Sequence, residues 1–86
     1  MQQYVPCYFY FRSHRGWEQN NTAATSLFAA AFQALSWFRD WYGPKPKMNT
    51  VLKIHAGWAG GQKTYYVRAR RVLEHYGFDP REWLED

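Results

Sequence analysis

The side chains that could hold a metal ion or act as a nucleophile are Cys7, His14, His55 and His75. None of them falls into the paired spacing of metal ligands, so we expect no metal site. Cys7 lies in an apolar stretch and is interpreted as a small core residue, with a Cys7–His55 nucleophile pair as the alternative. Carboxylates are few and mostly terminal, which leaves no obvious pair for acid–base catalysis. We therefore expect a protein that is not an enzyme and needs no cofactor.

A second pattern with chemical meaning is the segment 57–64, Gly-Trp-Ala-Gly-Gly-Gln-Lys-Thr. It follows a predicted strand, opens a predicted helix and ends in Lys63 and Thr64, so it resembles a phosphate-binding P-loop. Gln62 departs from that motif, which has glycine there because backbone amides must approach the phosphates. A nucleotide hydrolase also needs a larger parallel sheet and an acidic magnesium ligand, for which 86 residues leave no room. Two simpler interpretations are helix amides beside Lys63 that hold one phosphate or carboxylate, or a flexible glycine connection with a solvated lysine.

The net charge of +4 is concentrated in one part of the chain. No acidic residue occurs between Asp40 and Glu74, whereas seven lysines and arginines do. Guanidinium groups bind oxyanions bidentately, so this segment suits phosphates or an acidic groove. An ordinary solvated helix surface, partly neutralised by Glu74 and the acidic C-terminal residues, is the alternative. The residues that we expect to bind nucleic acid or an acidic partner are Lys45, Lys47, Lys63, Arg68, Arg70 and Arg71.

Aromatic residues make up 21% of the chain, and two groups of them are candidates for binding. Tyr8 and Tyr10 alternate with apolar residues along a predicted strand and, with Arg12, could form a surface on which bases stack. The sequence motif of RNA-recognition sheets is absent, however, and a tyrosine face in the core or in a subunit interface is the alternative. The tryptophans that could anchor a protein interface are Trp37, Trp41 and Trp58.

The N-terminal half predicts one strand and one long helix. Residues 4–11 are β-branched and aromatic, and in a strand their odd-numbered side chains face one side and their even-numbered side chains the other. Pro6 cannot donate a backbone hydrogen bond, which indicates that the early part of this strand lies at a sheet edge. Residues 13–21 are interpreted as a loop. The helix is predicted from about Thr22 to Tyr42 and is closed by Gly43.

The C-terminal half predicts a second strand over residues 50–56, which together with the preceding strand and helix indicates a crossover unit. Residues 63–76 allow two interpretations. A helix is favoured because their apolar side chains cluster on about a third of a helical wheel, whereas a strand over residues 64–72 would form a hairpin with the second strand. Gly77 is expected to cap that helix. A last short turn begins at Asp79 and Pro80, with Glu82 completing a capping box, and should pack on the core.

These elements predict a single α+β domain over residues 1–86, in the order strand, long helix, strand, helix and short C-terminal helical turn. The alternative order is β-α-β-β, with residues 64–72 as the third strand. A two-stranded sheet is too thin to be stable alone. Its edge is therefore expected to pair with another protein or with a second copy, which would make a homodimer.

We expect the protein to be soluble and cytoplasmic. Cys7 is the single cysteine and cannot form an intrachain disulfide, which fits a reducing compartment. No apolar run approaches the roughly 20 residues that span a bilayer, and residues 1–6 do not resemble a secretory signal. No membrane partner is expected.

Two non-enzymatic functions agree with these features. The first is nucleic-acid binding, with lysines and arginines on phosphates. The second is a protein-interaction module or inhibitor that docks on an acidic or nucleic-acid-handling protein through the same basic residues. Small inhibitors encoded by phages and other mobile elements have this size. Nucleic-acid binding should weaken steeply with salt, whereas a protein interface should lose most of its affinity when an aromatic anchor is truncated.

Overall fold

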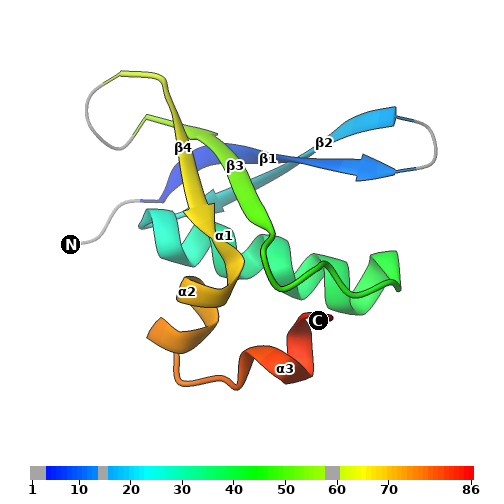
Figure 1. Cartoon of the computed structure of the whole chain (residues 1–86). Coiled ribbons are helices and arrows are strands. Elements are labelled where there is room, and N and C mark those ends of the chain that lie inside the picture. The colour runs from blue at the N-terminus through cyan, green and yellow to red at the C-terminus, as the bar shows by residue number, and fades with distance from the viewer. Residues whose placement is uncertain (1–3, 14–15, 58–60) are drawn as a thin grey trace.

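A computed structural model describes residues 4–13, 16–57 and 61–86, with side chains for all of these except residues 11–13, 16–18 and 42. Within these residues a four-stranded antiparallel sheet carries all the helices on one face (Figure 1). This arrangement confirms the predicted α+β class. In the order β2-β1-β3-β4, the sheet contains the strands β1 (Val5–Ser13), β2 (Gly16–Ala24), β3 (Val51–Ala56) and β4 (Lys63–Arg68). The helical elements are α1 (Leu27–Trp37), the π-helical turn η1 (Phe38–Tyr42), α2 (Ala69–His75) and α3 (Pro80–Trp83).

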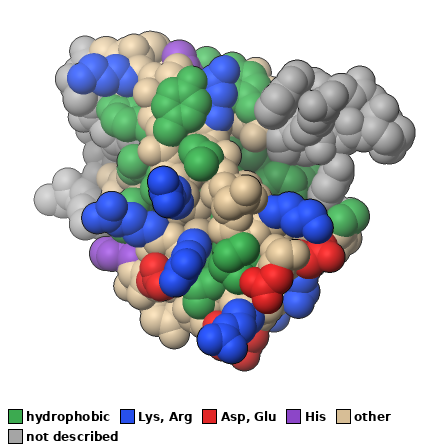
Figure 2. All heavy atoms as spheres, in the orientation of Figure 1, with side chains coloured by type: hydrophobic (Ala, Val, Ile, Leu, Met, Phe, Trp, Pro, Cys, Tyr) green, Lys and Arg blue, Asp and Glu red, His purple; other side chains and the backbone are tan. Residues whose placement is uncertain are grey.

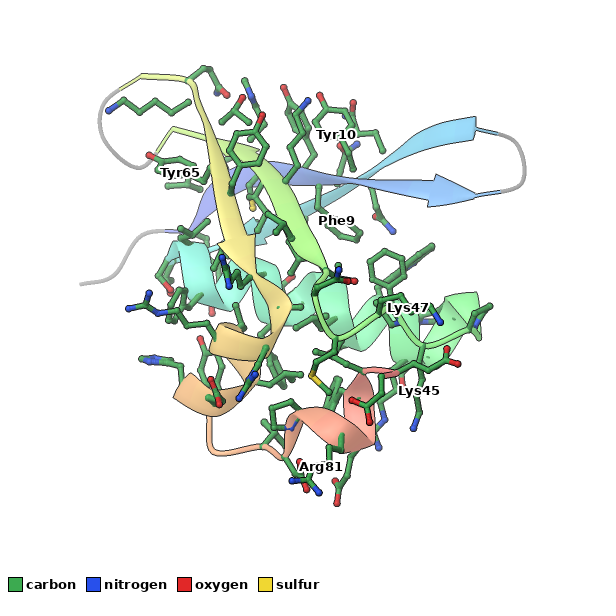
Figure 3. The ribbon with its side chains drawn as sticks, viewed as in Figure 1. Phe9, Tyr10, Lys45, Lys47, Tyr65 and Arg81 are labelled. Carbon is green, nitrogen blue, oxygen red and sulfur yellow. The ribbon has the colours of Figure 1, made fainter. Side chains whose placement is uncertain are left out.

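Strand β1 lies inside the sheet and separates the core from the opposite face. Cys7 and Phe9 are buried, whereas Tyr8 and Tyr10 are half-buried on the other side. Figure 3 shows Phe9 on the helix side of the sheet and Tyr10 on the far side. The predicted alternation is therefore confirmed for these residues. The predicted edge position is confirmed for the start of the strand: β3 pairs only with residues 7–10 of β1, so Val5 and Pro6 pair with β2 alone among the described strands.

Strand β2 occupies most of the segment that we interpreted as a loop, so that interpretation is wrong. It pairs with β1 from Ala24 opposite Val5 to Gly16 opposite Ser13. Its polar residues have low strand propensity. The strand forms nevertheless, because its backbone is hydrogen-bonded to β1 and because polar side chains are acceptable in an edge strand. The side chain of Gln33 on α1 also donates to the Ala23 carbonyl, at 3.0 Å, which ties the strand to the helix.

Helix α1 begins five residues later than predicted, because the chain remains in β2 until Ala24. Ser26 is the N-cap, and its hydroxyl accepts a hydrogen bond from the Ala29 amide at 3.2 Å. The predicted end is confirmed: η1 stops at Gly43, whose φ of 100° favours glycine. In the described part of the chain no helix is long and apolar enough to cross a membrane.

Residues 63–76 divide between the two structures that we considered. The first part is β4, which pairs antiparallel with β3 from Lys63 opposite Ala56 to Arg68 opposite Val51. The second part is α2. The favoured continuous helix is therefore wrong before Ala69, and the alternative strand is wrong after Arg68. An amphipathic helix follows a strand directly here, so neither the helical nor the strand spacing of apolar residues extends over the whole segment.

The four-stranded sheet also corrects two expectations about topology. Strands β1 and β3 are antiparallel, so no parallel crossover links them. The reason is β2, which reverses the chain direction before α1. Because the sheet has four strands, it does not need a partner strand for the reason that we gave, and the prediction of edge pairing loses that support.

The predicted C-terminal turn is confirmed. Asp79 caps α3 by accepting a hydrogen bond from the Arg81 amide at 3.0 Å, and Gly77 has the expected positive φ of 82°. Trp83 and Leu84 are buried in the core. The Glu85 backbone continues from α3 and bonds to residues 46 and 48 over 2.8 and 2.7 Å, which holds the chain end on the domain.

The core prediction is tested by replacing Ile54, which is 1% exposed on β3. Ile54→Ala removes buried methyl groups and should lower the free energy of unfolding by about 2–5 kcal/mol. Val51→Ala on the same strand is the matched control, since Val51 is 52% exposed, and should cost less than about 1 kcal/mol. Urea unfolding followed by circular dichroism measures both. Equal losses would contradict the assignment of the two faces.

Candidate nucleic-acid interface

The sheet face opposite the helices is not covered by any described element (Figure 1). We call this surface the outer face. Its residues alternate along the strands with those of the core, because successive side chains in a strand point to opposite sides. Among the residues whose side chains are described, the register places twelve on it: Pro6, Tyr8, Tyr10, Gln19, Asn21, Ala23, Val51, Lys53, His55, Thr64, Tyr66 and Arg68.

One row across the outer face contains a stacked pair of rings. Tyr8 lies opposite His55, which lies opposite Thr64. The Tyr8 and His55 ring centroids are 5.0 Å apart with an angle of 22° between the planes. His55 Nδ1 is 3.0 Å from the Thr64 hydroxyl oxygen. The hydrogen bond fixes the imidazole beside Tyr8, so the two rings form a ready stacking surface.

The next row places a cation among aromatic rings. Lys53 Nζ lies 4.9 Å from the centroid of the Tyr10 ring, within the range of a cation–π contact. Tyr10 meets Tyr8 edge to face, at 5.7 Å and 84°. Tyr66 on β4 ends the row, and 68% of it is exposed. Rings and a lysine therefore alternate over the three strands β1, β3 and β4.

The surroundings of Tyr8 on the outer face shift its pKa. Desolvation raises the pKa of Tyr8 above its ordinary value, and Tyr10 adds to the shift through its charge and through a side-chain hydrogen bond. The Tyr8 phenol is therefore neutral at physiological pH and does not repel a phosphate.

The six basic residues that we predicted do not form one patch. Arg68, Arg70 and Arg71 gather where β4 joins α2, and Lys and Arg side chains are visible over these elements in Figure 2. Lys63 is at the opposite end of β4, opposite Ala56. Figure 3 shows Lys45 and Lys47 beside the C-terminal segment, and Lys47 Nζ is 3.6 Å from a Glu85 carboxylate oxygen.

The three arginines differ in their partners. Arg70 makes an ion pair with Glu74 at 3.5 Å. Arg68 and Arg71 are exposed, and neither has an acidic partner within ion-pair distance among the described residues. These two guanidinium groups are therefore free to bind an external anion.

The candidate tryptophan anchors also differ. Trp37 is half-buried and its ring contacts Phe9 at 6.0 Å and Phe38 at 5.4 Å, so it belongs to the border of the core rather than to an exposed anchor. Trp41 on η1 is 79% exposed. Trp58 lies outside the described residues.

The resemblance to a P-loop does not extend to the structure. Lys63 begins a strand that pairs antiparallel with β3, whereas a P-loop leads into a helix. Because Lys63 begins a strand, it does not stand at a helix N-terminus whose amides could hold a phosphate, and that hypothesis is therefore wrong as well. Residues 58–60 of the pattern lie outside the described part of the chain.

Cys7 and His55 do not form a nucleophile pair, because they lie on opposite faces of adjacent strands. Burial raises the pKa of the Cys7 thiol, although a hydrogen bond with the Ala24 backbone acts in the opposite direction. The thiol is therefore a protonated core group. Among the described residues no group of three or more His, Cys, Asp and Glu could hold a metal ion.

Sequence reasoning missed three contributors to the outer face: Lys53, His55 and Tyr66. The alternation of residues 50–56 placed Lys53 and His55 on one side of a strand, but nothing in the sequence placed that strand beside Tyr8 and Tyr10. Tyr66 is one of the apolar side chains in residues 63–76 whose clustering on a helical wheel led us to favour a helix. The signal that could have found it is the alternation of Tyr65 and Val67 with polar residues, which indicates a strand.

Comparisons of this chain with protein-family models, with curated proteins and with solved structures find no match. The chemical character of the site therefore rests on its own geometry: aromatic rings interleaved with cations on an uncovered sheet.

The buried state of Cys7 is tested by thiol labelling. Cys7 is 1% exposed and its pKa is raised, so native protein should react with a thiol-specific disulfide reagent far more slowly than protein in denaturant. The expected factor is on the order of 10³ or more, since a small folded domain opens that rarely. Reaction at the same rate in both conditions would contradict the placement of this side chain.

Proposed function

We propose that this protein is a non-enzymatic binder of single-stranded nucleic acid and that the outer face is its binding surface. The observation that supports this proposal most strongly is the set of four rings, Tyr8, Tyr10, His55 and Tyr66, that surround Lys53 on a face that no described element covers. Single-strand binders use the same combination of stacking rings and backbone-tracking cations.

The arrangement of the rings fits a flexible strand. Neighbouring strands of a sheet are about 4.8 Å apart, so bases that follow a row across the sheet meet rings on successive strands. The Tyr8–His55 pair offers a preformed stack that a base can extend. The side chain of Lys53 is exposed and can rotate. When a base stacks on the Tyr10 ring, the Lys53 ammonium group can therefore leave that ring and bind a phosphate.

A duplex fits this surface less well than a single strand does. The bases of a duplex are stacked on one another and present only their edges, whereas unpaired bases can be splayed out onto aromatic rings. The outer face offers rings rather than a protruding helix or ribbon that could enter a major groove. Its recognition chemistry is therefore that of stacking.

The charge distribution supports an anionic ligand. Lys53 and Arg68 belong to the outer face, and the acidic side chains visible in Figure 2 lie in the lower part of that view, over α2, α3 and the C-terminus. A positive field on one side of a small domain raises the local concentration of phosphates and speeds association.

The contribution of stacking is tested by Tyr10→Leu, which keeps an apolar side chain on β1 but removes the ring. Affinity for fluorescein-labelled oligothymidylate and oligouridylate of twelve nucleotides should fall about 5- to 150-fold, because one stacked base contributes about 1–3 kcal/mol. Fluorescence anisotropy measures the affinity. Tyr76→Leu is the matched control, since Tyr76 is an exposed tyrosine at the end of α2, and should leave binding unchanged.

The result that would contradict stacking is equal affinity of both variants and the unchanged protein. Tyr10→Phe adds a second check: it keeps the ring, so it should bind almost as well as the unchanged protein. If labelled duplexes of the same sequence bind as tightly as the single strands, the preference for unpaired bases is wrong.

The contribution of charge is tested by Lys53→Gln. If Lys53 neutralises one phosphate, the slope of log K against log salt concentration should become shallower by about 0.7, the value for one contact with a single strand. Lys47→Gln is the control, because Lys47 already faces Glu85. Anisotropy titrations at four salt concentrations give the slopes. An unchanged slope in Lys53→Gln would remove this residue from the site.

The exposure of Trp41 favours a second candidate function, a module that docks on an acidic or nucleic-acid-handling protein. Trp41 is 79% exposed on η1, away from the outer face, and exposed aromatic residues are typical anchors of interfaces. Under this alternative, single strands do not bind even at low salt. Under the main proposal they do bind, and Trp41→Ala leaves their affinity unchanged.

A further inference from the structure

A surface hollow of about 450 Å³ lies at the free edge of β4, directly beside the outer face. Its lining combines the apolar side chains of Leu27 and Phe28 at the start of α1 and of Val67 with Tyr66, Arg68 and Arg71. Phe28 is supported from behind by His75, at a centroid distance of 4.7 Å. The hollow thus joins an aromatic and aliphatic wall to two guanidinium groups.

The hollow continues the aromatic row of the outer face. Tyr66 ends the row that begins with Tyr10 and Lys53, and the same residue lines the hollow. Arg68 likewise belongs to both surfaces. A strand that stacks along this row therefore arrives at the hollow, where α1 closes the apolar side.

We propose that this hollow binds the terminal nucleotide of the single strand, with its base against Phe28 and Tyr66 and its terminal phosphate between Arg68 and Arg71. This inference rests on the proposed function, because the strand must already lie on the outer face. It adds recognition of a phosphorylated strand end to the sequence-independent stacking of bases on the rings of the outer face.

Charge complementarity distinguishes a terminal phosphate from an internal one. A phosphate monoester carries a charge of about −1.5 to −2 at pH 7, whereas an internal phosphodiester carries −1. Arg68 and Arg71 both lack an acidic partner among the described residues, so two positive charges face the hollow. Two guanidinium groups that donate bidentately match the three free oxygens of a monoester.

The neighbouring arginine provides a matched control. Arg70 is two residues from Arg68 and is also exposed, but it does not line this hollow. It lines a neighbouring hollow of about 310 Å³ with Met48 and Val51, and Arg68 lies between the two because it lines both. Its guanidinium group is paired with Glu74. Removing the charge of Arg70 therefore changes the net charge by the same amount as removing that of Arg71, but outside the proposed end site.

The experiment compares three thymidine hexanucleotides, with a 5′-phosphate, with a 3′-phosphate or with hydroxyls at both ends, by isothermal titration calorimetry at pH 7.5. One of the two phosphorylated strands should bind about tenfold more tightly than the hydroxyl-ended strand. Arg71→Gln should abolish this gain, so that the phosphorylated and hydroxyl-ended strands bind that variant with equal affinity, whereas Arg70→Gln should keep the gain. The gain should shrink at pH 5.5, because the second pKa of a phosphate monoester is about 6.

Three results with the hexanucleotides would overturn the end site. They are equal affinity of all three strands, equal gains for both phosphorylated ends, or loss of hydroxyl-ended binding in Arg71→Gln, which would place an internal phosphate at Arg71. Thymidine monophosphate serves as a competitor and gives a fourth: if it displaced the phosphorylated strand as well as the strand displaces itself, the hollow would hold a free nucleotide instead. If none of the strands binds, the proposed function itself fails, and this outcome is distinct from the four that overturn only the end site.

Discussion

The antiparallel pairing of β1 with β3 is the interaction on which both the core and the candidate site depend. It sets Cys7 opposite Ala56 and Phe9 opposite Ile54 on the buried side, and by the same register Tyr8 opposite His55 and Tyr10 opposite Lys53 on the outer side. Since side chains alternate strictly in a strand, a slip of one residue would bury the polar set and expose the core. The hydrophobic effect that holds the register therefore also assembles the rings and the lysine.

The described helices lie on one face of the sheet, because only that face carries the apolar side chains that must be buried. The buried residues of α1 are mostly small, with Ala30, Ala31 and Ala34 at its contact surface, which lets the helix approach the sheet closely. The C-terminal segment adds Trp83 and Leu84 from below, and its acidic side chains gather there, away from the outer face. The helix side of the sheet thus holds the buried core, whereas no described element covers the outer face.

The sequence predicted the elements whose patterns are strong and local. The alternation of β1, the glycine ends at Gly43 and Gly77, and the capped turn at Asp79 need only neighbours in the chain. It failed for β2, which is polar and is a strand only because β1 supplies its hydrogen bonds, and for the junction at Ala69, where the period changes within one segment. Tyr8 and Tyr10 were identified as stacking candidates, but their companions Lys53, His55 and Tyr66 come from strands that only the tertiary structure places beside them.

The measurement that tests the central claim most directly is an NMR titration of ¹⁵N-labelled protein with unlabelled oligothymidylate of twelve nucleotides. If the outer face binds the strand, the amide shifts should concentrate in β1, β3 and β4, around Tyr10, Lys53 and Tyr66, while the amides of α3 stay in place. Shifts confined to η1 or to the C-terminal segment, or no shifts at low salt, would contradict the claim that this sheet surface binds single-stranded nucleic acid.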